Sequence, residues 1–298
     1  MTKHNLDKHF MPSEEGDRPQ GLLADLLPVS IATKRGPLRN DRRKLVVYLE
    51  PFFVGLFEGN GCLYMRKTKN GKYSYGVLQI DLKFLPENEA MLKMIASHFG
   101  GTIQYEKKGG VITKVKWLAI AQKTVEDCLS VFEKYPFLTS RKICQLNHLK
   151  QCIKLNTWGY HLETRDSRYH KQKDIIKHYK ANLIIPPYFG PWLSGFTEAE
   201  GCFRSTHRLS FYISQNDDWY ILNAIKTYLG SHHKVGVHKD SRRPWLGTVQ
   251  YRVSMSGKPT IENIVNHFSQ FPLLGYKKIS YESFCQFYFA QSNLKTKA

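Results

Sequence analysis

Two short stretches of this chain are closely similar, "GLFEGNGC" at residues 55–62 and "GFTEAEGC" at residues 195–202, and the fold can be predicted from them. Each contains a glycine, three intervening residues, a small residue, one polar residue and then Gly-Cys. The polar residue is Asn60 in the first stretch and Glu200 in the second. The same motif therefore occurs twice, with an amide in one copy and an acid in the other.

The motif begins a longer pattern that is also repeated. Hydrophobic periodicity predicts an alternating segment at residues 72–84 and a helix at residues 87–101. Two strands are predicted next, at residues 102–106 and 111–121, and then helices at residues 124–138 and 139–146. The same order recurs at residues 207–216, 218–230, 234–239, 247–255, 261–274 and 275–284. Gly55 and Gly195 lie 140 positions apart, and Pro136 and Pro272 lie 136 apart. Such agreement indicates an internal duplication.

Each copy is predicted to form a mixed α/β (α+β) half-domain in the order αββαββα, with an antiparallel sheet. Two such halves are expected to pair about a pseudo-two-fold axis. The predicted organisation starts with an N-terminal extension at residues 1–44 and a first half-domain at residues 45–150. A basic linker with some helix follows at residues 151–187, and a second half-domain at residues 188–298.

The charge of the chain indicates a polyanionic partner. Its 298 residues carry 44 Lys and Arg against 25 Asp and Glu, a net charge of +19. Solubility of a small domain needs a net charge of only about 2–8, so nucleic acid is the better explanation. An anionic membrane is the weaker alternative, because no apolar run approaches the roughly 20 residues of a membrane span.

The cysteines and the N-terminus carry little functional information. The six cysteines include no CxxC pair and no zinc-ligand spacing, which predicts six reduced and mostly buried thiols. The first 20 residues contain no apolar signal-peptide core, and their acids argue against a transit peptide.

Small residues in the motif predict close packing of two helices. Gly55 and Gly59 lie four residues apart on one helix face, as do Gly195 and Ala199 in the second copy. This spacing lets two helix backbones approach closely. The glycines that follow, at positions 61 and 201, are expected to end the helices as C′ glycines.

The polar residue of each motif is then expected to project from a helix C-terminus. An acid there is unfavourable, because the helix dipole already places negative charge at that end. Two adjacent acids would be worse, and the pKa of one would rise. A divalent cation removes the objection, and carboxylate oxygens with water suit Mg²⁺. Such a pair can activate water for phosphodiester cleavage.

The predicted strands alternate between apolar and polar residues. The polar rows are rich in side chains that can read base edges in the major groove of DNA, although an ordinary half-solvated sheet shows the same alternation. The candidate DNA-binding residues are Tyr75, Asp81, Lys83, Lys114, Lys116, Arg204, Arg208, Ser210, Tyr212, Ser214, His238, Lys239, Gln250, Arg252 and Ser254.

These segments resemble the LAGLIDADG homing endonucleases in their single-chain, two-motif form, a pseudo-symmetric monomer. The matching stretches are "FVGLFEGNG", "LSGFTEAEG", "YPFLTSRK" and "FPLLGYKK", at residues 53–61, 193–201, 135–142 and 271–278. The resemblance implies that the motif helices form the interface between two αββαββα halves. It also implies that the sheets form a saddle on a duplex DNA site of about 20 base pairs, which is cleaved to leave short 3′ overhangs.

The resemblance also assigns roles to particular residues. The last acid of each motif binds divalent metal, which corresponds to Glu200 and to position 60, with Gly59 and Ala199 beside them. Mg²⁺ is the implied cofactor, and Ca²⁺ substitutes for binding without cleavage. A basic residue near the scissile phosphates corresponds to Arg141 and Lys277. A polar strand residue corresponds to Gln79 and, less directly, to Tyr212.

Asn60 departs from the family pattern, because it keeps an oxygen that can touch metal but lacks the charge. This copy is therefore expected to be impaired or inactivated in cleavage. An engineered acid-to-amide change that traps uncut DNA, natural decay and adaptation to another role all fit, and the intact remainder favours the first. The main alternative function is that of a maturase that binds intron RNA to assist splicing, and a further one is DNA binding without cleavage. The resemblance also implies a mitochondrial or other organellar location.

Overall fold

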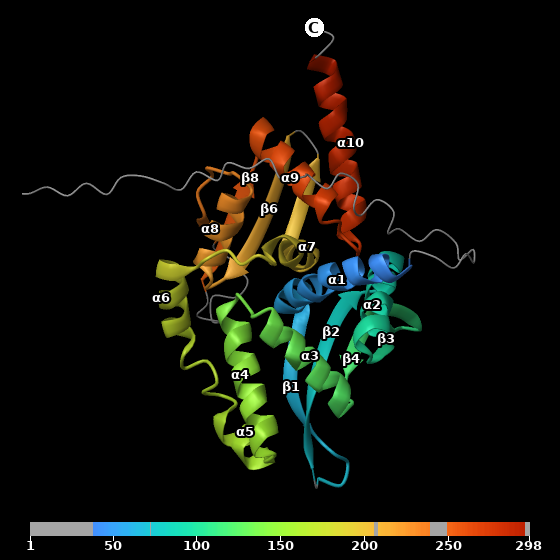
Figure 1. Ribbon diagram of the computed structural model, residues 1–298, viewed down its shortest axis with the longest axis vertical. Coiled ribbons are helices and arrows are strands. Elements are labelled where there is room, and N and C mark those ends of the chain that lie inside the picture. The colour runs from blue at the N-terminus through green and yellow to red at the C-terminus, as the bar shows by residue number, and fades with distance from the viewer. Residues whose placement is uncertain (1–37, 72, 206–207, 239–248, 296–298) are drawn as a thin grey trace, which may run out of the picture. The chain divides into compact units, whose positions relative to one another are not determined.

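The two motif stretches form the ends of helices α1 (Leu38–Asn60) and α7 (Phe189–Glu200), which pack against each other (Figure 1). Residues 51–58 and 192–198 are buried, as expected for helices in the core rather than at a surface. The computed structural model describes residues 38–71, 73–205, 208–238 and 249–295. Helix α1 begins seven residues before the boundary expected at position 45.

The close approach of α1 and α7 depends on two glycines. A methyl group at Gly55 would collide with the carbonyl oxygen of Trp192 and lie 2.8 Å from the backbone nitrogen of Phe196. A methyl group at Gly195 would collide in the same way with the carbonyl oxygen of Phe52. The predicted packing of the two motif helices is therefore confirmed.

This contact predicts the sign of a stability change. In an ordinary helix, replacing glycine with alanine stabilises by about 1 kcal/mol. We expect Gly195→Ala to lower the free energy of unfolding by about 3 kcal/mol, because the helices must separate. Gly159→Ala is the matched control, since Gly159 is also helical but a methyl group there meets nothing within 4 Å. Urea unfolding of both variants measures the effect, and a stabilised Gly195→Ala protein would contradict it.

The glycines after the motifs end the two helices. Neither Gly61 nor Gly201 has a positive φ, and Gly201 is extended with φ −82° and ψ 156°. Both glycines directly follow the last residue of a helix, as predicted, but neither has the left-handed conformation that is common at C′. Glycine is required for space instead, because a methyl group at Gly61 would lie 2.5 Å from the Phe57 ring, and one at Gly201 2.5 Å from Cγ2 of Thr197. Each glycine passes the chain directly from a helix into a strand.

Each half contains one four-stranded antiparallel sheet. The first has the order β1-β2-β4-β3 and the second the order β5-β6-β8-β7. Their strands are β1 (Gly61–Lys67), β2 (Ser74–Lys83), β3 (Thr102–Lys108), β4 (Val111–Ala119), β5 (Gly201–Ser205), β6 (Leu209–Asn216), β7 (Gly236–His238) and β8 (Gln250–Met255). The equal strand order confirms the duplication, and the predicted mixed α/β fold of two antiparallel halves is confirmed with it.

Helices cover one face of each sheet. They are α2 (Pro86–Phe99), α3 (Gln122–Lys134) and α4 (Ser140–Leu155) on the first sheet, and α8 (Trp219–Tyr228), α9 (Lys258–Gln270) and α10 (Lys277–Lys295) on the second. Two more helices, α5 (Trp158–Thr164) and α6 (Gln172–Asn182), fall within the expected linker and contact α4. The helices leave the other face of each sheet for polar residues.

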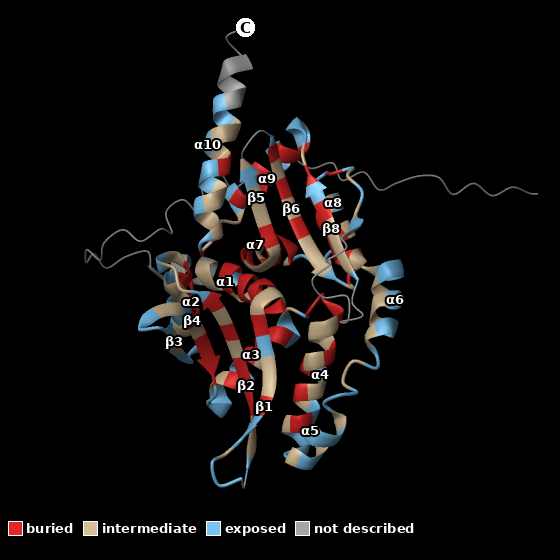
Figure 2. Cartoon of the chain, turned by 180° about the vertical axis from the view of Figure 1, so that it is seen from behind, coloured by how far each residue is buried: buried red, intermediate tan, exposed pale blue. Residues whose placement is uncertain are grey.

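Burial alternates along the strands as the sequence predicted. In β6 the buried residues are Leu209, Phe211 and Ile213, with half-buried residues between them (Figure 2). Phe211 packs on Phe203 and Phe268, with ring centroids 5.0 and 5.8 Å apart. Within the described part of the chain, no helix is long and apolar enough to span a membrane.

Candidate active site and nucleic-acid interface

Asn60 and Glu200 are the last residues of α1 and α7, and the two helix ends lie together. A methyl group at Gly59 would collide with the side chain of Ala199 and lie 3.4 Å from Cγ of Glu200. The side chains of Asn60 and Glu200 are half-buried. The fold therefore brings the amide-bearing end of one motif to the acid-bearing end of the other.

The oxygen donors at these ends suit a divalent cation. Glu200 offers a carboxylate, Asn60 an amide oxygen, and the last carbonyl groups of a helix have no partner within the helix. Mg²⁺ and Ca²⁺ prefer such oxygen ligands. The residues therefore fit a hard cation, although only one of the two motif ends supplies a negative charge.

The surroundings of Glu200 strongly shift the pKa of its carboxyl group. Burial raises the pKa of its carboxyl from 4.5 to about 7, against the opposing effect of Lys277 and Lys142. Near neutral pH a larger fraction of this carboxyl than of an ordinary glutamate therefore stays protonated when no cation is bound. Perturbed acids of this kind are concentrated at functional sites.

Lys142 is a basic residue that the sequence analysis missed. Its Nζ donates a hydrogen bond to the backbone carbonyl of Gly61, and burial lowers the pKa of its ammonium group. It thus lies at the end of the first motif, as Lys277 does for the second. The only signal in the sequence was its place in the "RK" pair that also contains Arg141.

Arg141 itself is not brought to Glu200. Its guanidinium carbon lies 4.6 Å from the ring centroid of Tyr169, a linker residue. Successive residues of a helix point about 100° apart, so of two neighbours in α4 only one can face the motif end. The structure places Lys142 there and directs Arg141 towards the linker.

The earlier acid of each motif holds the segment that carries these basic residues. Glu58 accepts a hydrogen bond from the backbone N–H of Thr139 at 2.6 Å, just before α4. Glu198 accepts from the backbone N–H groups of Gly275 and Lys277 at 2.7 and 3.2 Å. Both acids are buried. Their signal in the sequence is an acid two positions before the polar residue in both copies.

The exposed face of the first sheet carries a connected polar network. Tyr64 donates to Oε1 of Gln79 at 2.6 Å, and Nε2 of Gln79 donates to Asp81 at 2.6 Å. Lys116 pairs with Asp81 at 3.6 Å and with Glu106 at 2.6 Å. The other predicted residues of this sheet lie in the same polar rows of strands β2 and β4. They are Tyr75, Lys83 and Lys114.

The second sheet has arginines around a tyrosine. The guanidinium carbons of Arg204 and Arg252 lie 5.8 and 5.2 Å from the ring centroid of Tyr212. Arg252 also donates to Ser214 at 3.2 Å. Of the other predicted residues, Ser210, Ser254 and Gln250 belong to β6 and β8, Arg208 is exposed beside β6, His238 ends β7, and Lys239 lies outside the described residues.

The predicted polar strand residue occupies the same position in both sheets. Gln79 is the cross-strand partner of Cys62, and Tyr212 is the cross-strand partner of Cys202. Both cysteines directly follow the motif glycine. The equivalence expected between Gln79 and Tyr212 is therefore present in the strand register.

A buried acid also joins the halves near this site. The Asp218 carboxylate, just before α8, accepts hydrogen bonds from the backbone N–H of Ser140, at 2.9 Å, and from its hydroxyl. Tyr220 donates to the carbonyl of Leu138 at 2.8 Å. The start of α4, which carries Lys142, is thus held by the second half.

Asp218 predicts a pH dependence of stability. Burial raises the pKa of its carboxyl from 3.8 to about 7. The free energy of unfolding that depends on this group is therefore greatest below about pH 4, where the folded and the unfolded chain both hold the proton. Between about pH 4 and 7 only the unfolded chain ionises, and the free energy of unfolding falls by at most about 1.4 kcal/mol per pH unit. Asp218→Asn should lessen this slope in urea unfolding, and an unchanged slope would show that Asp218 already ionises in the folded state.

The chain is similar to known proteins over most of its length. A sequence model of the LAGLIDADG endonuclease family matches residues 53–153 and 193–288. A probable intron-encoded endonuclease aI3 from Debaryomyces hansenii is 32% identical over 270 residues, which covers 80% of this chain and 38% of that protein. A protein of the same name from Dictyostelium citrinum is 32% identical over 255 residues, which covers 84% of this chain and 100% of that protein.

Solved structures show a similar fold. I-SmaMI bound to an uncleaved DNA target in the presence of calcium ions superposes with a TM-score of 0.60 at 21% identity. I-AabMI bound to uncleaved DNA gives a TM-score of 0.59 at 19% identity. Each match covers 83% of this chain and 92% of the other. At these identities the likeness concerns the fold.

Proposed function

Because this chain belongs to the LAGLIDADG endonuclease family, we propose that it is a homing endonuclease that binds a long duplex DNA site and cleaves phosphodiester bonds. The observation that carries this proposal is the meeting of the two motif ends, where Glu200 lies within the influence of two lysines. The relatives are named intron-encoded endonucleases, which supports the same reading.

In this proposal each group at the motif ends has a distinct role. Glu200 and Asn60 would hold the divalent cation together with backbone carbonyls, and we expect Mg²⁺ in this place. A bound cation there would lower the pKa of a water molecule and stabilise charge on the leaving oxygen. Lys142 and Lys277 would stabilise negative charge on the phosphate. Glu58 and Glu198 position these lysines through the backbone.

The polar sheet faces would supply binding and sequence recognition. Phosphate contacts position a protein on the duplex, whereas contacts with base edges specify the sequence. Arg204 and Arg252 stand beside Tyr212, and a bidentate arginine suits guanine in the major groove. With a net charge of +19, affinity should fall steeply as salt rises.

We expect Arg252→Ala to reduce the preference for the target over a scrambled duplex by about 1–3 kcal/mol. Lys258→Ala is the matched control, because Lys258 is exposed on α9, which covers the opposite face of the sheet. Fluorescence anisotropy over a series of salt concentrations measures both. If Arg252→Ala weakens all duplexes equally, Arg252 contacts phosphate rather than a base.

The test of the proposed function compares DNA and RNA directly. The probes are a duplex that spans the intron-insertion site, a scrambled duplex and the intron RNA. Specific binding of the first and its cleavage with Mg²⁺ support the proposal. Equal affinity for both duplexes would contradict it, and splicing activity without any DNA cleavage would establish the maturase alternative.

We further infer that the protein acts as a monomer and in an organelle. A single chain already contains both motif helices and both sheets, so one copy can present two half-sites. The organellar location rests on the intron-encoded names of the relatives.

A further inference from the structure

Three metal-ligating side chains gather in a part of the chain that the proposed cleavage does not use. His148 and Cys152 lie four residues apart on α4, and therefore on one helix face, while His161 belongs to α5 of the linker. One ligand atom from each lies within 4.8 Å of the others. Cys152 is buried and both histidines are half-buried.

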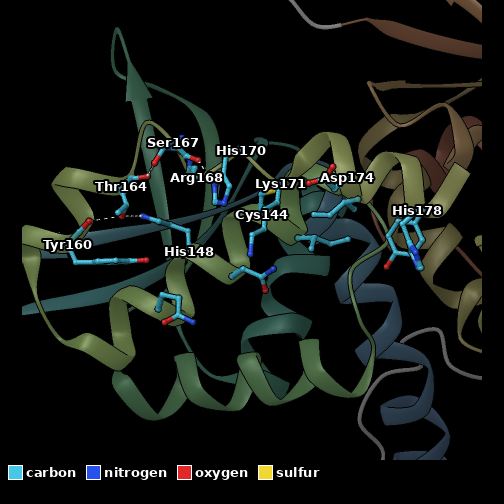
Figure 3. A pocket seen from close by; sticks show the side chains of 15 residues that line it. Cys144, His148, Tyr160, Thr164, Ser167, Arg168, His170, Lys171, Asp174 and His178 are labelled. Carbon is cyan, nitrogen blue, oxygen red and sulfur yellow. Dashed lines mark hydrogen bonds between the residues drawn. The ribbon is translucent and has the colours of Figure 1, made fainter.

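The hydroxyl of Thr164 fixes the tautomer of His148. Thr164 Oγ1 donates its proton to the carbonyl of Tyr160 at 2.6 Å (Figure 3). Nε2 of His148, 3.0 Å from the same hydroxyl oxygen, must therefore be the donor of that hydrogen bond. Nδ1 then keeps a lone pair, which can accept from the Cys152 thiol or bind a metal ion. Metal-binding histidines characteristically donate their other N–H to an oxygen in this way.

The cluster has separations near those of a zinc site. Sγ of Cys152 lies 3.6 Å from Nε2 and 3.8 Å from Nδ1 of His148. With Zn–S near 2.3 Å and Zn–N near 2.0 Å, tetrahedral geometry separates a sulfur and a nitrogen ligand by about 3.6 Å. Nδ1 of His161 is buried and has no hydrogen-bond partner in the described structure. A buried polar atom of this kind can take a partner such as a bound ion or water.

We propose that His148, Cys152 and His161 bind one Zn²⁺ ion, which fastens the linker helix α5 to α4. A cavity of about 720 Å³ is lined by His148 but not by Cys152 or His161, and water would complete the coordination. Thiolate and imidazole ligands favour zinc over Mg²⁺ or Ca²⁺, so this site differs in chemistry from the oxygen donors at Glu200. On binding, the Cys152 thiol releases its proton to solvent and its sulfur bonds the metal.

The charge around the cluster makes Cys152 the decisive ligand. The charges of Arg165 and Arg168 disfavour a cation at His161, and the charge of Asp166 favours one. Binding of a divalent cation at this place therefore depends on the negative charge of the Cys152 thiolate. Cys152→Ser keeps the size of the side chain and removes that charge. Cys144→Ser is the matched control, because Cys144 is also buried on α4 but lies outside the cluster.

The experiment is a cobalt titration of the full chain after dialysis against EDTA, followed by competition with zinc. We expect one cobalt ion per chain with a sulfur-to-cobalt charge-transfer band. Cys152→Ser should lose that band and weaken zinc binding at least about 100-fold, whereas Cys144→Ser should keep both. Thr164→Val should weaken zinc binding about tenfold, because His148 loses its orienting partner.

Further readouts separate this site from the proposed nuclease site and from misfolding. Glu200→Gln should keep the cobalt band, because the oxygen donors contribute no sulfur. Zinc should raise the Tm of the parent and of Cys144→Ser but not of Cys152→Ser. If Cys152→Ser does not fold, His161→Ala serves in its place. A parent without a sulfur–cobalt band, or a band that survives both ligand substitutions, would overturn the proposal.

Discussion

Replacing Glu200 with glutamine should lower metal-dependent DNA cleavage about 1,000-fold, equal to about 4 kcal/mol of transition-state stabilisation. Glu200 is the sole carboxylate at the two motif ends, so the amide leaves no charged ligand there. DNA affinity measured in Ca²⁺ should change by less than about tenfold, because the sheets rather than the motif ends supply most phosphate contacts. Single-turnover cleavage and anisotropy measure the two effects.

The same side chain predicts the pH dependence of cation binding. Because the pKa of Glu200 is raised to about 7, protons compete with the cation below neutral pH. The apparent affinity should fall up to about tenfold per pH unit below pH 7 and level off above it. Glu262→Gln is the control, since Glu262 is exposed on α9. A Glu200→Gln protein that cleaves like its parent would overturn the site assignment.

Restoring an acid at position 60 should have the opposite effect. We expect Asn60→Asp to raise double-strand cleavage in Mg²⁺ about 100-fold, because a charged ligand replaces a neutral one and stabilises the cation through the reaction. Without metal, two carboxylates would face each other at two helix C-termini, where the dipoles also disfavour them. The variant should therefore be no more stable than the parent until Mg²⁺ is added.

The comparison of these two proteins also decides what Asn60 does. Both should bind the target equally in Ca²⁺, so that any difference in Mg²⁺ reports on chemistry alone. Equal cleavage by both proteins would show that residue 60 is not a metal ligand. If neither protein cleaves and the parent promotes splicing of its intron RNA, the motif ends serve the fold rather than catalysis.

The duplicated architecture could be predicted from the sequence alone. Local patterns carried this information: small residues four apart, strand alternation and a helix–strand order that recurs at a fixed spacing. Gly55 and Gly195 predicted the helix contact correctly, because only glycine permits such close backbones. Asn60 and Glu200 were identified as the chemically important positions for the same reason, since they end the repeated motif.

Which side chains meet at the motif ends depends on how the helices and sheets pack. Lys142 rather than Arg141 reaches the first motif end, because the direction of a residue on α4 depends on how Asp218 and Glu58 hold its first turn. The roles of the glycines after the motifs also depended on local space rather than on φ.

The cluster of His148, Cys152 and His161 shows most clearly that contacts between distant side chains cannot be predicted from local sequence patterns. Two of its residues have only a helical spacing in the sequence, and the third comes from another helix that folds back on α4. Periodicity in a sequence records which face of an element is buried. Contacts between elements are set by the packing of whole helices and sheets, so a site assembled from several of them appears only in the folded chain.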